Sequence, residues 1–154
     1  MSVRSILFVC LGNICRSPLA EGIARNLAEY EGVELELDSA GTGAWHRGEL
    51  PCEGSVRIAQ KRGVDISMLR ARQVREEDAS RFDLIIAMDQ NNLSDLKRFG
   101  FPQEKLFLLG EFGLAGQDIP DPYHYRGEEG FEKVFEMIEE GVKTLLKNHG
   151  LLRL

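Results

Sequence analysis

The chain has 154 residues, a formal net charge of −6 at pH 7 and a sequence pI near 5.2. This length predicts one domain, residues 1–154, around a single hydrophobic core. The acidic balance argues against nucleic acid or an anionic membrane as the main partner. The longest apolar run near the N-terminus, residues 6–11, is too short for a signal-peptide core or a membrane span. We expect a cytoplasmic monomer.

The first predicted element is a buried strand, because residues 5–9 are apolar on both faces apart from the opening serine. Ser17 and Pro18 are typical of a helix N-cap and first turn, and Gly32 is typical of a helix end. A strand, a short loop and a helix therefore follow one another. The N-terminus of a helix carries unpaired N–H donors and partial positive charge, so the loop predicts an anion site.

Within this loop, Cys10 and Arg16 are the candidate catalytic residues. Arg16 offers a planar, permanently charged group that can bind two phosphate oxygens. The same cation and the helix N-terminus favour the thiolate form of a cysteine, which makes Cys10 a candidate nucleophile. The alternative is a buried cysteine before an ordinary capped helix. The other predicted phosphate-binding and loop-support residues of this stretch are Leu11, Gly12, Asn13, Ile14, Cys15 and Ser17.

Glycine allows close backbone approach, and asparagine tolerates left-handed backbone angles, so Gly12 and Asn13 suit a tight phosphate loop. An alternating stretch at residues 33–38 predicts an edge strand. The loop after it carries Ser39, which either bonds Asn13 or only closes a local turn. Further on, Trp45 lies in a glycine-rich loop without periodicity, which favours a pocket wall over a core position.

The remaining chain alternates helical and strand patterns. Residues 55–62 predict a helix, and the mixed-charge stretch 74–78 is typical of a solvated face. Strands are predicted at 84–88 and 106–109, and helices at 90–98 and 128–148. Asp89 is a natural cap for the shorter of these two helices. The alternation predicts an α/β fold: one doubly wound, four-stranded parallel sheet flanked by helices, with the phosphate loop after the first strand.

Asp121 is the third candidate catalytic residue, as a general acid. It lies between Pro120 and Pro122, which fix the backbone on either side, in a segment with little periodicity. A rigid Pro-Asp-Pro turn without chemistry is the alternative.

The motif V-C-x-G-N-x-C-R-S-P-x-A-E at residues 9–21 resembles, without a gap, the opening motif of the low-molecular-weight protein tyrosine phosphatases. Further matches follow at residues 39–42, at Trp45, at 71–73, at 87–89 with 92–93, and at 121–123. The resemblance covers nearly the whole chain. It implies hydrolysis of phosphotyrosine in a protein partner through a phosphocysteine intermediate, with no metal and no other cofactor.

The resemblance also implies a substrate cleft lined by aromatic side chains. Trp45 and Tyr123, with His124 or Tyr125, are the candidates for holding the substrate ring. Two positions depart from the family pattern. Cys52 and the two residues after it replace a common Asp-Pro-Arg, and Leu69 lies near the place where some relatives carry a histidine that orders the loop. We expect Ser39 to provide that support instead.

The three cysteines are an odd number without evident metal-ligand spacing, which predicts reduced thiols. A reversible disulfide between Cys10 and Cys15 is a hypothesis, since they are five residues apart in one loop. The role of Cys52 stays open.

Three other functions compete with tyrosine phosphatase activity. Protein-arginine phosphatases of similar fold tend to carry threonine where this chain has Ile14. Arsenate reductases of similar fold need a further pair of downstream cysteines, and this chain has none after Cys52. A non-catalytic phosphate-binding module would lack Cys10 or Asp121.

Overall fold

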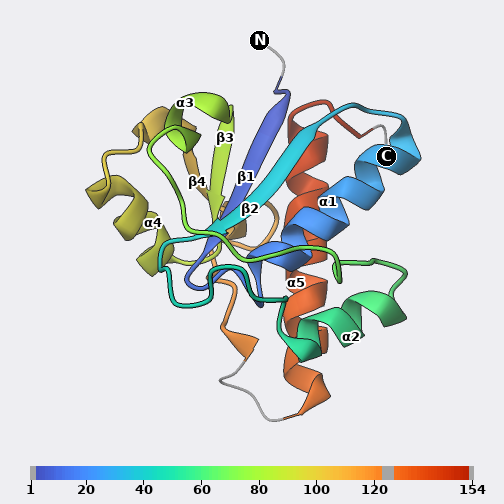
Figure 1. The fold of residues 1–154 in the computed structure, drawn as a ribbon. Coiled ribbons are helices and arrows are strands. Elements are labelled where there is room, and N and C mark those ends of the chain that lie inside the picture. The colour runs from blue at the N-terminus through green and yellow to red at the C-terminus, as the bar shows by residue number, and fades with distance from the viewer. Residues whose placement is uncertain (1–2, 123–126, 153–154) are drawn as a thin grey trace.

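A computed structural model describes residues 3–122 and 127–152. Its sheet has four parallel strands in the order β2-β1-β3-β4 (Figure 1). The strands are β1 (Ser5–Cys10), β2 (Glu36–Gly41), β3 (Leu84–Ala87) and β4 (Leu106–Leu108). The predicted α/β fold with a four-stranded parallel sheet is confirmed.

Helices cover both faces of this sheet (Figure 1). The α-helices are α1 (Ser17–Glu31), α2 (Glu53–Lys61), α3 (Asp78–Arg81), α4 (Gln90–Arg98) and α5 (Glu128–Asn148), and two short 3-10 helices are η1 (Gln103–Lys105) and η2 (Leu109–Glu111). On one face α1 packs against α5, and α5 also packs against α2. On the other face α4 contacts β3 and β4.

The central strand β1 is buried along its whole length because both of its faces are covered. Ile6 and Phe8 join the hydrophobic cluster that includes α1 and α5. Leu7 and Val9 point the other way, into the cluster that contains Phe82. Side chains of a strand alternate between faces, so a strand covered on both sides has to be apolar throughout. This strand carries Cys10 at its carboxyl end, next to the loop of the candidate site.

The second strand differs from its prediction. It was expected at 33–38, but β2 starts at Glu36 and continues to Gly41. The reason is its pairing with β1, which runs in register from Ser5 opposite Glu36 to Cys10 opposite Gly41. Residues 39–41, predicted as loop, are therefore strand residues that lie directly beside the end of β1.

The observed helix boundaries agree with most, but not all, of the capping residues predicted from the sequence. Gly32 ends α1 in the left-handed conformation, Asp89 caps α4 with its side chain, and α5 spans the predicted residues. The prediction of Ser17 as an N-cap is wrong, because Arg16 occupies that position and Ser17 is the first helical residue. The predicted helix 55–62 is α2, which starts two residues earlier, at Glu53.

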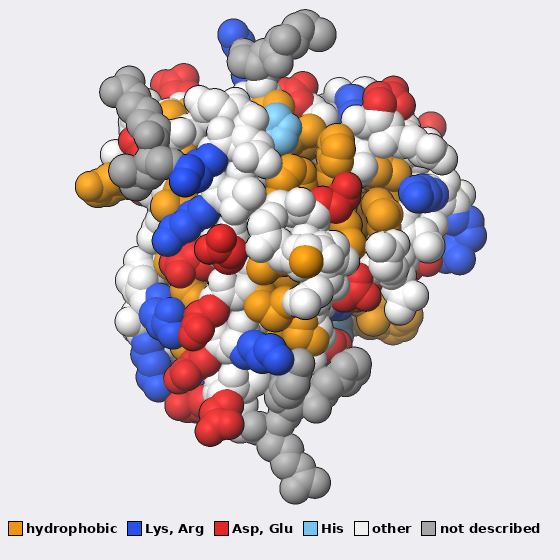
Figure 2. Space-filling model, turned by 180° about the vertical axis from the view of Figure 1, so that it is seen from behind, with side chains coloured by type: hydrophobic (Ala, Val, Ile, Leu, Met, Phe, Trp, Pro, Cys, Tyr) orange, Lys and Arg blue, Asp and Glu red, His pale blue; other side chains and the backbone are white. Residues whose placement is uncertain are grey.

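Acidic and basic side chains are interspersed over the face drawn in Figure 2 rather than gathered by sign. Among the described residues, no helix is both long and apolar enough to cross a bilayer. The same residues include no group of three or more His, Cys, Asp or Glu side chains arranged to hold a metal ion.

Candidate active site

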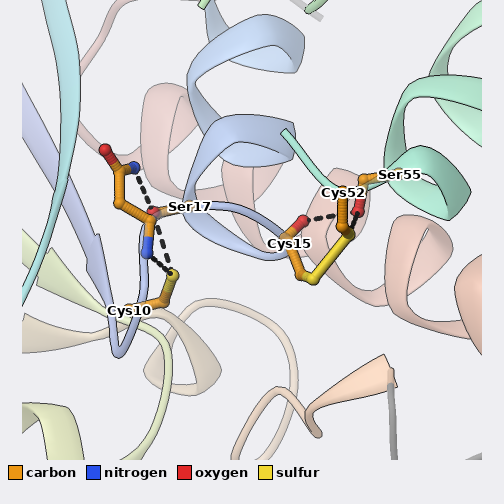
Figure 3. Close-up of a disulfide and its surroundings, with 6 residues drawn as sticks. Cys10, Cys15, Ser17, Cys52 and Ser55 are labelled. Atoms are coloured by element: carbon orange, nitrogen blue, oxygen red, sulfur yellow. Dashed lines mark hydrogen bonds between the residues drawn. A yellow bond between two sulfur atoms is a disulfide. The ribbon is translucent and has the colours of Figure 1, made fainter. Parts of the chain in front are cut away.

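The Cys10 sulfur lies at the carboxyl end of β1, in the curve of the loop that leads to α1 (Figure 3). The Asn13 backbone N–H donates to Cys10 Sγ over 3.2 Å, and the Ser17 hydroxyl lies 3.1 Å from the same sulfur. Cys10 and Ser17 are buried. This explains why Ser17 does not cap the helix: its hydroxyl is used inside the loop. Two polar neighbours therefore stabilise negative charge on this sulfur.

Asn13 fixes the shape of the loop. Its backbone has a φ of 57°, the left-handed conformation predicted for this residue. Its side-chain N–H₂ group donates to Ser17 Oγ over 2.8 Å and to Ser39 Oγ over 2.9 Å, and its carbonyl oxygen accepts from the Arg72 backbone N–H over 2.9 Å. The predicted bond between Ser39 and Asn13 is confirmed. Buried amide groups with all their partners satisfied hold a backbone in one conformation.

Arg72 was not predicted as part of this support. Its guanidinium bonds both carboxylate oxygens of Asp78 over 2.9 and 3.1 Å, and it also bonds Asp38. Burial alone would lower the pKa of Arg72, but the hydrogen bonds and charges of Asp78 and Asp38 outweigh it and raise the pKa. The interpretation of residues 74–78 as a solvated face is wrong for Asp78, which is fully buried because it pairs with this cation.

Gly41 brings β2 against the loop. A Cβ atom at this position would lie 2.7 Å from the Leu11 carbonyl oxygen and 3.1 Å from the Asn13 nitrogen, both of them backbone atoms. Backbone atoms cannot rotate away, so a side chain here has to displace the loop.

We expect Gly41→Ala to lower kcat/KM for an aryl phosphate by ~10²-fold, since a misplacement of about 1 Å in a catalytic site costs that much. Gly22→Ala is the matched control: its Cβ would meet Ile66 and Val64 side chains in the core, which affects stability but not the loop. Steady-state kinetics and thermal unfolding of both variants test this. Wild-type kinetics in Gly41→Ala would contradict the close approach.

Glu21 supports the loop from the first turns of α1. This buried carboxylate accepts from Ser39 Oγ over 2.7 Å and pairs with Arg25 over 2.5 Å. Burial raises the pKa of Glu21, and the hydrogen bonds from Ser39 and Arg25 only partly oppose that shift. Glu21 was not predicted as a site residue, because a glutamate on a helix gives no sign of burial.

The raised pKa of Glu21 predicts a pH-dependent stability. The folded protein holds this proton more tightly than the unfolded chain, so its stabilising effect is present below pH 4.5 and is lost as pH rises through the folded pKa. Glu21→Gln should therefore gain stability relative to wild type as pH increases across this window, measured by urea unfolding. Glu29→Gln, exposed on the same helix, controls for loss of one negative charge. A difference between wild type and Glu21→Gln that stays constant with pH would contradict the prediction.

Hydrogen bonds donated by its Nη1 atom hold the Arg16 guanidinium in place. This atom donates to Asp89 Oδ2 over 2.6 Å and to the Ile119 carbonyl oxygen over 3.0 Å. Asp89 therefore has two functions, since its other oxygen accepts from the Asn92 N–H as the cap of α4. Only the capping function was predicted. Because Arg16 is almost fully buried and fixed on one side, its guanidinium has a defined orientation without a ligand.

The loop also presents backbone donors. Within the described part of the chain, the N–H groups of five loop residues donate to no protein acceptor. These residues are Leu11, Gly12, Ile14, Cys15 and Arg16. Cys15 and Arg16 are buried, and buried N–H groups without partners are rare in native proteins, so this cluster indicates a site for an acceptor from outside the chain.

A cavity of about 100 Å³ joins these donors to residues from distant parts of the chain. It is lined by Cys10, Leu11, Gly12, Ile14, Cys15, Arg16, Trp45, His46 and Asp121. The three candidate catalytic residues therefore meet at one cavity. Trp45 is 70% exposed on its wall, as a pocket residue rather than a core residue.

His46 is a wall residue that the sequence did not single out. Its ring lies against Gly12, where an added Cβ would come within 2.9 Å of the ring, and its Nδ1 lies 3.0 Å from a Glu49 carboxylate oxygen. Its position directly after Trp45, a predicted pocket residue, was the sequence signal that could have identified it. The aromatic predictions Tyr123, His124 and Tyr125 lie outside the described residues.

The cysteines differ from their prediction. Cys15 and Cys52 form a disulfide, and Cys10 is a free thiol (Figure 3). The expectation of three reduced thiols is wrong for this pair, and the structure does not pair Cys10 with Cys15. The physical reason is proximity: Cys52 directly precedes α2, its N–H donates to the Ile14 carbonyl oxygen over 2.8 Å, and the two Cα atoms are 5.3 Å apart.

This geometry has clear counterparts among known proteins. A family model described as low molecular weight phosphotyrosine protein phosphatase matches residues 5–151. The chain belongs to this family. The low molecular weight protein-tyrosine-phosphatase YfkJ of Bacillus subtilis is 45% identical over 150 residues, covering 92% of this chain and 93% of the relative.

Two further proteins show the same breadth of similarity. Low molecular weight phosphotyrosine protein phosphatase 1 of Drosophila melanogaster is 42% identical over 94% of this chain and 96% of its own length. The crystal structure of a protein tyrosine phosphatase from Entamoeba histolytica, with Hepes in the active site, superposes with a TM-score of 0.87 at 33% identity, over 94% of this chain and 96% of the other. The low-molecular-weight phosphatase fold thus extends over nearly the whole chain.

Proposed function

We propose that this low-molecular-weight phosphatase hydrolyses phosphotyrosine in protein substrates, with Cys10 as nucleophile, Arg16 as phosphate-binding residue and Asp121 as general acid. The observation that carries the proposal is the single cavity at which these three side chains meet the unpaired N–H groups of the loop. The Entamoeba histolytica relative holds Hepes, a sulfonate, in its active site, which supports an oxyanion site here.

In the first step Cys10 Sγ attacks phosphorus and the ester oxygen leaves. The loop N–H groups and the outward edge of Arg16 stabilise the negative equatorial oxygens in the transition state. Removing one preorganised donor of this kind typically costs ~10²–10³ in rate. Asp121 donates a proton to the departing phenolate oxygen, and a phosphocysteine forms.

In the second step water attacks phosphorus and releases inorganic phosphate. Asp121, now a carboxylate, accepts a proton from that water, and the Cys10 thiolate leaves. The Ser17 hydroxyl at 3.1 Å and the Asn13 N–H at 3.2 Å stabilise this leaving thiolate.

We infer the substrate class from the lining of the cavity. The nucleophile is buried, while Trp45 forms an exposed wall that can contact an aromatic ring. This arrangement favours phosphotyrosine, whose ring can contact the wall, over the shorter phosphoserine. Ile14 lines the same cavity, so the position that tends to be threonine in arginine phosphatases is apolar here.

A panel of matched peptides carrying phosphotyrosine, phosphoserine or phosphoarginine tests this proposal. We expect the highest kcat/KM for phosphotyrosine, and Trp45→Ala should reduce this preference by raising KM for the aromatic substrate. Preferred turnover of phosphoarginine would overturn the substrate assignment in favour of the arginine-phosphatase alternative. The cytoplasmic location and the monomeric state stay predictions from sequence.

A further inference from the structure

We propose that Cys52 is a second resolving cysteine. It exchanges with a disulfide formed between Cys10 and Cys15, becomes bonded to Cys15 and so returns Cys10 to the free thiolate. The inference rests on the proposed function insofar as Cys10 is the nucleophile. It names a regulatory activity of the same site, in which hydrogen peroxide is the oxidant and an external dithiol is the reductant.

Cys15 connects the phosphate loop to Cys52. Cys15 is a loop residue that lines the cavity with Cys10 on one side and is bonded to Cys52 on the other (Figure 3). Cys15 is therefore the one cysteine in contact with both environments. Any oxidation of Cys10 that Cys15 resolves can move on to Cys52 by thiol–disulfide exchange.

Hydrogen bonds that do not involve sulfur also hold the Cys15–Cys52 pair together. The Cys52 N–H donates to the Ile14 carbonyl oxygen over 2.8 Å, and the Ser55 hydroxyl donates to the Cys15 carbonyl oxygen over 2.8 Å. Neither bond includes a sulfur atom, so we expect both to join the loop to the start of α2 after reduction as well. The two thiols therefore stay within reach of each other after reduction.

The surroundings of Cys10 favour it as the thiol that leaves. In a Cys10–Cys15 disulfide, Cys52 attacks Cys15 Sγ, and Cys10 departs as a thiolate into the site where the Asn13 N–H and the Ser17 hydroxyl stabilise it. A stabilised thiolate is the better leaving group in such an exchange. Cys52 lies at the N-cap of α2, where the partial positive charge of the helix N-terminus favours the attacking thiolate form.

The sequence of steps balances. The Cys10 thiolate attacks hydrogen peroxide, which gives a sulfenic acid and hydroxide. The Cys15 thiol condenses with that sulfenic acid, forming a disulfide and water. The Cys52 thiolate then attacks Cys15, forming the Cys15–Cys52 disulfide and releasing the Cys10 thiolate. Overall two thiols and one peroxide give one disulfide and two waters, and an external dithiol later reduces the disulfide.

The experiment uses the fully reduced full-length protein and one equivalent of hydrogen peroxide, quenched at intervals with an alkylating agent. Disulfides are mapped by peptide mass spectrometry, and aryl phosphatase activity is followed in parallel. We expect the Cys10–Cys15 disulfide to appear first and then be replaced by Cys15–Cys52. Activity should fall and return without added thiol.

We call this transfer of oxidation from Cys10 through Cys15 to Cys52 the relay. Two variants distinguish the relay from direct oxidation of Cys15 and Cys52 by peroxide. Cys52→Ser should stop at Cys10–Cys15 and stay inactive until dithiothreitol is added. In Cys10→Ser the Cys15–Cys52 disulfide should form much more slowly, because the reactive thiol is missing. An unchanged rate in Cys10→Ser, or wild-type activity that returns only after dithiothreitol, would overturn the relay. Disulfide mapping does not depend on turnover, so an inactive reduced wild type would contradict the proposed function while leaving the relay testable.

Discussion

Replacing Cys10 by serine should abolish hydrolysis of an aryl phosphate while phosphate binding is retained. The serine hydroxyl is a far weaker nucleophile than a thiolate, and the neighbouring N–H and hydroxyl at 3.2 and 3.1 Å are placed to stabilise a thiolate. Loss of a nucleophile in covalent catalysis costs on the order of 10⁶ in kcat. The loop N–H groups and Arg16 do not depend on the sulfur, so the anion site stays intact.

Turnover of p-nitrophenyl phosphate and calorimetric titration with inorganic phosphate measure these two properties separately. The matched control is Cys52→Ser under reducing conditions, the same chemical change at a cysteine that does not line the cavity. We expect this control to keep wild-type turnover. Substantial hydrolysis by Cys10→Ser would rule out the phosphocysteine mechanism.

Replacing Asp121 by asparagine should lower kcat by ~10²–10⁴, the usual contribution of a general acid. Asparagine keeps the size of the side chain but cannot supply the proton. The loss should be larger with phenyl phosphate than with p-nitrophenyl phosphate, because the nitrophenolate leaves readily without protonation. This dependence on the leaving group separates a proton donor from a residue that only shapes the cavity wall.

Asp118→Asn provides the matched control for Asp121→Asn. Asp118 is on the same segment, but it accepts from the Gln90 N–H over 3.1 Å and does not line the cavity of Cys10. Its replacement should leave the dependence on the leaving group unchanged. An equal loss with both substrates in Asp121→Asn would remove Asp121 from the role of general acid.

Local sequence signals were sufficient for much of the fold. The apolar run of β1, the Asp89 cap and the amphipathic pattern of α5 each depend on neighbouring residues, and each was predicted correctly. β2 was misplaced because its end is decided by pairing with β1 rather than by its own alternation. Pairing with a parallel strand that is distant in the sequence does not change the local pattern of residues.

In the site too, residues close in sequence were predicted together, and contacts between residues distant in sequence were not. Cys10, Asn13 and Arg16 belong to one short motif, so their proximity could be predicted from the sequence. The contacts of Asp89 with Arg16 and of Asp78 with Arg72 join residues that other signals had already explained as a cap and as surface charge. Charged residues carry no sign of burial in the sequence, because their partners lie on other elements.

The disulfide was missed for a related reason. Counting cysteines by spacing favoured Cys10 and Cys15, which are close in sequence. The geometry instead depends on how the segment before α2 lies against the loop, through the bond from the Cys52 N–H to Ile14. Cys52 had been recognised only as a departure from the family pattern.

The three hydrogen bonds of the Asn13 side chain have a consequence for the product. They fix the loop before any ligand arrives, so the same N–H groups and Arg16 are ready for the phosphate ion that hydrolysis releases. We therefore expect inorganic phosphate to compete with each new substrate molecule for the loop N–H groups and Arg16. In a cell, the rate at which this enzyme removes phosphate from proteins would fall as the concentration of free phosphate rises.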